Sequence, residues 1–298
     1  MTSGAAGSLS HAGALLLRLV STLMLVALLV SGCAAWTSSG TARLPDGVTV
    51  EVRQQRADVA PRQAQVVIGN GSDQTLVIGR VRMRDPRFAE DAARVVERES
   101  RVAPGATVDV RVQLAAVVCD GPDDAEPQVT FAFAVDGAEG EATVAAADPL
   151  GFLAPLHERE CRAERVTDAA SVAFTAFEPS PPGAPARLEL TIAPTGRGEV
   201  AIDAVQETNL ISFGAASVDG AFPLGVAVAT GDTAPIVVSL PIVPLRCDPH
   251  AVQEDKRGTI FDVRVVVGGA AGEIERFVGE DLRGRILSWV ADWCGFGE

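Results

Sequence analysis

The second half of the chain repeats the hydrophobic pattern of the first half, and this internal repeat limits the fold more than any other feature. At a constant offset of 124 positions, the apolar residues of three strand-like segments coincide without a gap. These segments are residues 48–52 with 172–176, 66–68 with 190–192, and 76–81 with 200–205. The offset grows to 128 at Cys119 and Cys247 and to 133 at Cys161 and Cys294. An offset that only increases, and does so inside loop-like stretches, indicates duplication followed by small insertions. Chance similarity of two β-rich halves is the alternative.

Within each half, the segments alternate apolar and polar residues with period two. Thr107–Val112 and Arg187–Ile192 show this alternation, and turn sequences such as Asn70–Asp73 separate the segments. Six or seven short antiparallel strands in about 120 residues predict a β-sandwich of immunoglobulin-like type. Each half then closes with a short helix that follows Asp148 or Asp281 and ends at the second cysteine of that half. The expected fold is mainly β, with two tandem immunoglobulin-like β-sandwich domains, each closed by a short C-terminal helix.

The N-terminus has the pattern of a secretory signal. Leu19–Val30 is twelve residues long without charge and follows Arg18, which suits a signal peptide and is short for a membrane span. Ser31-Gly32-Cys33 comes next and resembles the lipobox of bacterial lipoproteins. The resemblance implies cleavage before Cys33, acylation of its thiol with chains such as palmitate, and a lipid anchor on the extracytoplasmic face of the cell membrane. A retained transmembrane helix over Ala12–Val30 and a simple secreted form are the alternatives.

Four further cysteines are distributed two per repeat. On an extracytoplasmic protein they indicate disulfides, and four cysteines allow three pairings. The repeat favours Cys119 with Cys161 and Cys247 with Cys294, separated by 42 and 47 residues, because each unit must be self-sufficient. Each bridge would tie the closing helix of its domain to the end of a strand.

These features divide the chain into four parts. We assign residues 1–32 to a lipoprotein signal peptide, 33–44 to a tether, 45–165 to the first β-sandwich repeat and 166–298 to the second. Removal of the signal leaves 266 residues, enough for two domains that each bury a core of their own.

The net charge restricts the partners. The chain carries a formal charge of −14, which repels phosphate backbones and anionic lipid headgroups. We therefore do not expect the protein to bind nucleic acid.

The sequence contains no recognisable catalytic motif. We expect His157, in the first closing helix, to be solvated or to cap the helix C-terminus rather than to act as a general base. Cys247 and His250 have a spacing found in zinc sites, but a disulfide-bonded cysteine offers no thiolate. The acidic loop Asp120–Glu126 lacks the register of a calcium loop. We expect no catalytic residue, no metal and no cofactor.

One loop differs in character between the repeats. Asp248–Gly258 contains His250, Lys256 and Arg257, whereas the first repeat has an acidic, proline-bracketed loop there. Duplicated domains share the residues that their cores need, so a loop that differs is free of that packing demand. We predict a partner site at this loop, with an unconstrained solvent loop as the alternative.

Together these observations predict a non-catalytic, membrane-anchored module of the cell envelope with a binding or structural role. Its partner would be an envelope protein or a glycan, and we expect it not to be an enzyme. The alternatives are an accessory of an extracytoplasmic enzyme and a solute-binding lipoprotein. The second of these lacks the alternating strand and helix patterns that its usual lobes require.

Overall fold

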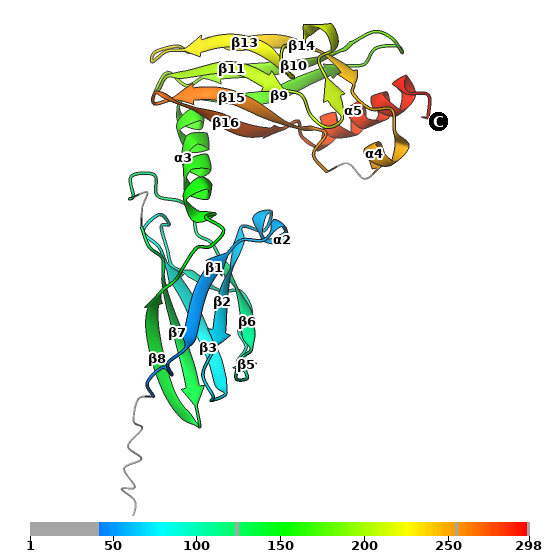
Figure 1. Cartoon of the computed structure of the whole chain (residues 1–298). Helices are drawn as coiled ribbons and strands as arrows, with labels where there is room; N and C mark the ends of the chain where they lie inside the picture. Colours follow the sequence, from blue (N-terminus) through cyan, green and yellow to red (C-terminus); the bar gives the residue numbers. More distant parts are fainter. Residues whose placement is uncertain (1–41, 123–124, 254–255, 297–298) are drawn as a thin grey trace, which may run out of the picture.

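The computed structural model describes residues 42–298, except 123–124, 254–255 and 297–298 (Figure 1). Cys33, the predicted signal and most of the tether lie outside the described residues. The prediction of a mainly β chain is confirmed, because strands outnumber helices in the described residues. The named strands pair with one another in antiparallel ladders, such as β1 with β2 and β10 with β14. No helix in the described part of the chain is both long and apolar enough to cross a membrane.

The strands before residue 146 form what we call the first β unit. Its elements are β1 (Val48–Arg53), α2 (Arg56–Val59), β2 (Gln63–Asn70), β3 (Leu76–Arg84), β4 (Ala92–Arg94), β5 (Ser100–Val102), β6 (Thr107–Gln113), β7 (Gln128–Val135) and β8 (Ala138–Ala145).

The first β unit is one continuous sheet rather than two. Its strand order is β1-β2-β6-β4-β3-β7-β8, and β5 pairs with β3. The short strand β4 joins the two halves because it pairs with both β3 and β6. At the opposite side, Val52 N donates to Ala147 O at 2.8 Å, which links β1 to the segment after β8. The unit is therefore hydrogen-bonded on both sides, unlike a sandwich with two separate sheets.

The strands after residue 169 form the second β unit. Its elements are β9 (Ala170–Glu178), β10 (Ala186–Pro194), β11 (Val200–Gln206), β12 (Ile211–Ser212), η1 (Gly214–Ala216), β13 (Ala221–Val228), β14 (Ile236–Pro244), α4 (Pro249–Gln253), β15 (Ile260–Val267), β16 (Ala270–Phe277) and α5 (Glu280–Trp293). The strands form two four-stranded sheets, with orders β12-β14-β10-β9 and β13-β11-β15-β16.

The two units share strand order and register. The run β1-β2-β6 of the first unit corresponds to β9-β10-β14 of the second, and the run β3-β7-β8 corresponds to β11-β15-β16. The matching pairs are Val66↔Val110 with Leu190↔Val238, Val81↔Phe131 with Val205↔Val263, and Phe133↔Gly140 with Val265↔Gly272. Both third strands also carry a register irregularity at the same place, after Ile78 and after Ile202. The hydrophobic pattern that repeats in the sequence thus corresponds to repeated strand pairing.

Helix α3 (Leu153–Ala169) differs from the expectation. We expected a short helix that ends at Cys161, whereas α3 has 17 residues and leads directly into β9. The physical reason is packing at both ends: Leu153 and Leu156 belong to the buried cluster of the first β unit, while Val166 and Ala169 belong to that of the second. The expected boundary between residues 165 and 166 falls inside this helix.

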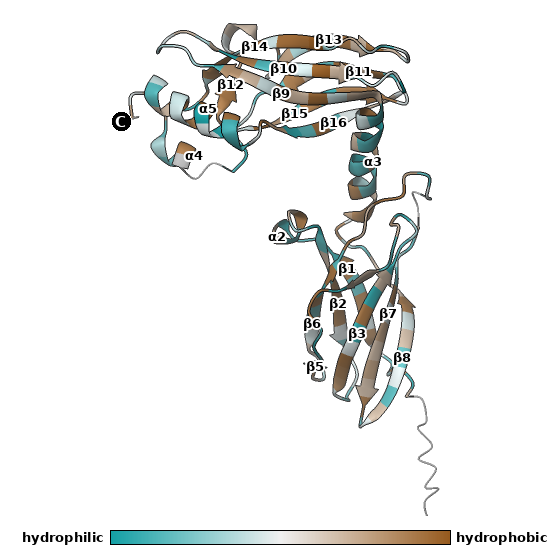
Figure 2. Cartoon of the chain, turned by 180° about the vertical axis from the view of Figure 1, so that it is seen from behind, coloured by the Kyte–Doolittle hydropathy of each residue, from teal (hydrophilic) through white to brown (hydrophobic). Residues whose placement is uncertain are grey.

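Figure 2 shows mainly hydrophilic residues along the middle of α3, between the two units. The buried apolar side chains form two clusters that share no residue among those described.

The structure contains both disulfides with the pairing that the repeat favours. Cys119 is bonded to Cys161 with a Cα–Cα distance of 5.4 Å, and Cys247 to Cys294 with 5.3 Å. Cys294 directly follows α5, so the C-terminal helix is tied to the segment after β14 as expected. Cys161 instead lies in the middle of α3.

Candidate binding groove

Three arginines project from one face of β3. Arg80, Arg82 and Arg84 are exposed, and they alternate with Val81 and Met83, which are buried in the core. Side chains in a strand point to opposite faces in turn, so the three guanidinium groups line the same outer surface.

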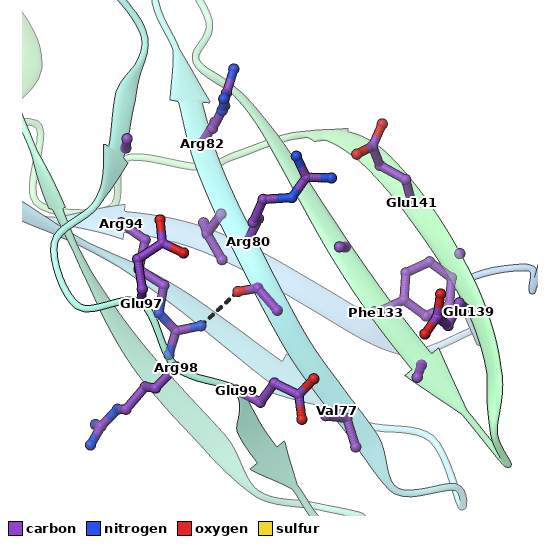
Figure 3. A pocket seen from close by; sticks show the side chains of 16 residues that line it. Val77, Arg80, Arg82, Arg94, Glu97, Arg98, Glu99, Phe133, Glu139 and Glu141 are labelled. Atoms are coloured by element: carbon purple, nitrogen blue, oxygen red, sulfur yellow. Dashed lines mark hydrogen bonds between the residues drawn. The ribbon is translucent and has the colours of Figure 1, made fainter.

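The next two strands complete a groove. On β7 the outward residues Ala132 and Ala134 are small, and their partners on β8 are Glu141 and Glu139. Because the middle strand offers only small side chains, a hollow of about 710 Å³ lies between the arginines and the glutamates (Figure 3). We call it the arginine groove. Arg80 and Arg82 line one side of it, Glu139 and Glu141 the other, and Ala132 and Ala134 its floor, whereas Arg84 lines a smaller adjoining hollow of about 230 Å³.

Arg94 holds one end of the groove in place. Its guanidinium donates to Gly79 O at 2.7 Å and to Ser100 Oγ at 2.7 Å, so it satisfies a carbonyl in the irregular part of β3. Burial lowers the pKa of Arg94, as does the nearby Arg98, while Glu97 acts in the opposite direction. Arg94 is therefore a structural residue of the groove wall.

The three arginines of β3 have no such partners. Within residues 42–298, leaving aside the few that are not described, none of the three guanidinium groups makes a hydrogen bond or an ion pair. Figure 3 shows Arg80 extending over β7 toward Glu141 without reaching it. A ligand group could therefore bind these guanidinium groups without displacing a protein contact.

The equivalent face of the second β unit is filled. At the repeat offset, Ala204, Gln206 and Thr208 stand where the first unit has its arginines. Arg264 occupies the position of Ala132, with Nε 3.9 Å from an Oε1 of its neighbour Glu273. The fold therefore does not require arginines on this strand or small residues on this floor.

Charged groups on that second face interact with one another. Gln206 is hydrogen-bonded to Glu273 across the sheet. Burial raises the pKa of Asp262, and the negative charges of Glu275 and Glu273 raise it further. The side chains of this face therefore interact with one another.

The loop predicted to bind a partner is placed outside the groove. His250 lies on α4 and its backbone N donates to Asp248 Oδ1 at 3.0 Å, while Lys256 is exposed. Arg257 is ion-paired with Glu275, which raises the pKa of the guanidinium mainly through their hydrogen bond. The loop therefore remains a prediction.

The expectation for His157 was wrong. Its side chain is buried, and its Nε2 lies 3.0 Å from the carbonyl oxygen of Val118, to which it is hydrogen-bonded. Val290 occupies the equivalent position on α5 and is also buried, so this is a core position in both units.

Among the described residues, no three histidine, cysteine, aspartate or glutamate side chains lie close enough to hold a metal ion.

Sequence reasoning missed the arginine groove. The available signal was the alternation of arginine with apolar residues over 80–84, together with its absence at 204–208 in the other repeat. The small residues of the floor became meaningful only once β7 was placed between β3 and β8.

Comparison with known proteins assigns no family, because no family model and no curated protein matches the chain. Solved structures give distant similarities. The Pseudomonas aeruginosa CupB2 chaperone has a TM-score of 0.22 and 11% identity, over 74% of this chain and 95% of that one. The CsuC–CsuE chaperone and tip adhesion subunit complex of Acinetobacter baumannii has a TM-score of 0.20 and 11% identity, over 72% and 91%. A red sea bream transglutaminase has a TM-score of 0.22 and 10% identity, over 80% and 32%. At these values the similarities carry no functional assignment.

Proposed function

We propose that this chain is a non-catalytic, membrane-anchored binding module of the cell envelope that recognises anionic groups in the arginine groove. The observation that carries the proposal is the row Arg80, Arg82 and Arg84, which has no partner among the described residues of an acidic chain. Arginine binds carboxylates and phosphates through two parallel hydrogen bonds, which gives geometric selectivity as well as attraction.

The row is poorly explained by folding alone. Three like charges on alternate positions of one strand repel one another, and that repulsion opposes folding. The second β unit adopts the same strand pairing with Ala204, Gln206 and Thr208 at these positions. A bound anion would reduce the repulsion, so ligand recognition accounts for the arginines where packing does not.

The proposal includes two tandem immunoglobulin-like domains. Support comes from the strand order, since the neighbours A-B-E and C-F-G of the immunoglobulin fold correspond to β1-β2-β6 and β3-β7-β8 and to β9-β10-β14 and β11-β15-β16. The separate buried clusters and the shared registers support it as well. In this arrangement the groove lies on the C-F-G face of the first domain.

Anchoring through Cys33 is the first testable part of the proposal. Cells that produce a Cys33→Ala variant should release the protein from the membrane pellet or retain an uncleaved precursor, because the acyl chains need the thiol. Membrane fractionation with immunoblotting measures both outcomes. Protein of mature size that remains in the pellet as in the wild type would contradict the lipid anchor.

Anion binding is the second testable part. The probe is the acidic peptide acetyl-Asp-Ala-Asp-Ala-Asp-amide, titrated calorimetrically into the detergent-solubilised full chain at low salt. Exposed ion pairs contribute roughly 0.2–1 kcal/mol each, so Arg80→Gln with Arg82→Gln should weaken binding about tenfold. The melting temperature should not fall, because neither guanidinium group makes a hydrogen bond or an ion pair among the described residues.

Two control variants make this test specific. Arg56→Gln with Arg159→Gln removes the same charge from exposed positions that do not line the groove, and binding should be nearly unchanged. Replacing His250, Lys256 and Arg257 together with serine tests the competing loop. Binding that survives loss of Arg80 and Arg82 but not loss of these three residues would overturn the proposal in favour of the loop.

A further inference from the structure

The three arginines of β3 differ in what stands beside them in the sheet. Gly79 and Arg80 lie opposite Ala132 on β7, and the partner of Ala132 on β8 is Glu141 (Figure 3). The backbones of β3 and β8 are roughly 10 Å apart, which is within the combined reach of an arginine and a glutamate side chain. Arg80 therefore has a compensating carboxylate in its own row.

Arg84 also has a carboxylate beside it. Ala92 on β4 is the partner of Met83, so Asp91, one residue earlier in the chain, is next in register to Arg84. The side chains of Asp91 and Arg84 line the same hollow of about 230 Å³ that adjoins the main groove. The positive charges at the two ends of the arginine row are thus each matched by one negative charge nearby.

Arg82, in the middle of the row, has no such match. Its partners in the sheet are Ala93 on one side and Thr130 on the other, and the partner of Thr130 is Thr143. Each of these three residues is uncharged. The hollow is lined by three arginines and two carboxylates, so one positive charge is left uncompensated, and the register places it at Arg82.

The two threonines beside Arg82 add a hydrogen-bond donor. The Oγ1 atoms of Thr130 and Thr143 are 2.8 Å apart and share a hydrogen bond, and the pair is exposed. Each hydroxyl carries one hydrogen, and their mutual bond uses only one of the two. The other hydrogen can be donated to a ligand oxygen next to the guanidinium group, which itself offers two parallel hydrogen bonds.

The second unit carries the opposite chemistry at the same register positions. Gln206 stands in the place of Arg82, and the pair Asp262 and Glu275 stands in the place of the two threonines. Two neighbouring carboxylates repel an anion. Because both units have the same strand pairing here, the pairing itself does not require an arginine beside two hydroxyls.

We propose that Arg82, together with the hydroxyl pair of Thr130 and Thr143, binds one singly charged carboxylate group of a ligand. The guanidinium group donates to both carboxylate oxygens, and one threonine hydroxyl donates to one of them. A single charge matches the one uncompensated arginine, whereas a doubly charged phosphate would be repelled by Glu141 and Asp91. This inference rests on the proposed function and adds the chemical class of the ligand and the residues that select it.

Methyl NMR spectra of the detergent-solubilised full chain test the ligand class. The methyl groups of Ala93 and Ala132 serve as reporters, because Ala93 is the sheet partner of Arg82 and Ala132 lines the hollow. At low salt, both resonances should shift with acetyl-Ala-Asp-Ala-amide and stay in place with the neutral analogue acetyl-Ala-Asn-Ala-amide. The peptide acetyl-Ala-phosphoserine-Ala-amide should bind no more tightly than the aspartate peptide. Tighter binding of the phosphoserine peptide would overturn the carboxylate assignment.

Arginine variants locate the site within the row. Arg82→Gln should weaken binding of the aspartate peptide about fivefold, the upper range for an exposed ion pair. Arg80→Gln with Glu141→Gln removes a matched pair of charges, and so does Arg84→Gln with Asp91→Asn. Because the uncompensated charge remains in both double variants, their binding of the aspartate peptide should be nearly unchanged.

Threonine variants test the hydroxyl pair. Thr130→Val with Thr143→Val removes both hydroxyls, keeps the shape of the side chains and should weaken binding about twofold. The matched control is Thr175→Val with Thr191→Val, which removes an exposed pair of hydroxyls 2.7 Å apart in the second unit. Binding by the control should equal that of the wild type, and the two double variants should melt at similar temperatures.

The outcomes separate this inference from the proposed function. If either matched-pair variant weakens binding as much as Arg82→Gln, or if loss of Thr130 and Thr143 hydroxyls has no effect, the site at Arg82 is overturned. If the probe acetyl-Asp-Ala-Asp-Ala-Asp-amide still depends on Arg80 and Arg82 in that case, anion recognition by the groove stands. If neither that probe nor the aspartate peptide binds in an arginine-dependent manner, both the site and the proposed function are overturned.

Discussion

Replacing Cys119 and Cys161 together with serine is expected to lower the melting temperature of the first β unit by about 15 °C. The bridge closes a loop of 42 residues, which corresponds to roughly 4 kcal/mol in the chain-entropy model. For a domain of this size, 1 kcal/mol shifts the melting temperature by about 4 °C. The bridge also ties the middle of α3 to the segment after β6, so its loss weakens the packing of the helix against the first unit.

Differential scanning calorimetry checks this expectation, with the matched variant Cys247→Ser and Cys294→Ser as control. If the two units unfold independently, each double variant lowers one transition and leaves the other in place. Equal shifts of both transitions by either variant would show that the chain unfolds as one cooperative body, contrary to the two-domain proposal.

Asp85→Asn should destabilise the first β unit by about 3–5 kcal/mol, the usual cost of leaving one member of a buried ion pair uncompensated. Arg87 donates to Asp85 through Nε at 2.9 Å and through a terminal nitrogen at 2.6 Å. The side chain of Arg87 is 5% exposed and that of Asp85 is 0% exposed. Water therefore cannot solvate the charge of Arg87 once the carboxylate of Asp85 is removed. Arg87 also donates to Ala125 O at 2.9 Å, which holds the loop beyond Cys119 against β3.

Chemical denaturation followed by circular dichroism measures the effect. The double variant Asp85→Asn with Arg87→Met removes both charges and should recover much of the lost free energy of unfolding. A single variant as stable as the wild type, or a double variant less stable than the single, would show that the pair contributes through its hydrogen bonds to the backbone rather than through its charges.

The strands and disulfides could be predicted because their signals are local or repeated. Alternation over Thr107–Val112 marks a half-buried strand wherever that strand lies, and two copies of one unit reduce three possible cysteine pairings to one. The bulge in β3 has no such signal. Gly79 and Arg80 lie between the part of β3 that pairs with β5 and the part that pairs with β4, and only the assembled sheet determines this arrangement.

The length of α3 and the burial of His157 could not be predicted for a related reason. The prediction ended the helix at Cys161 because it treated each unit as self-contained, but α3 contributes apolar residues to both cores. His157 reads as polar in sequence, whereas the carbonyl of Val118 lets it occupy a core position. The groove was missed because its walls are 57 to 61 positions apart, as with Arg80 and Glu141.

The direct junction between α3 and β9 has a mechanical consequence. No loop separates Ala169 from Ala170, so no hinge lies between the helix and the second unit. Seventeen helical residues rise about 25 Å. The helix packs against the first unit through Leu153 and Leu156, is held at its middle by the disulfide of Cys161, and continues at its C-terminal end into the sheet of the second unit. Such a strut transmits a pull on either unit to the other instead of absorbing it. The second unit is therefore held at a fixed distance from the first.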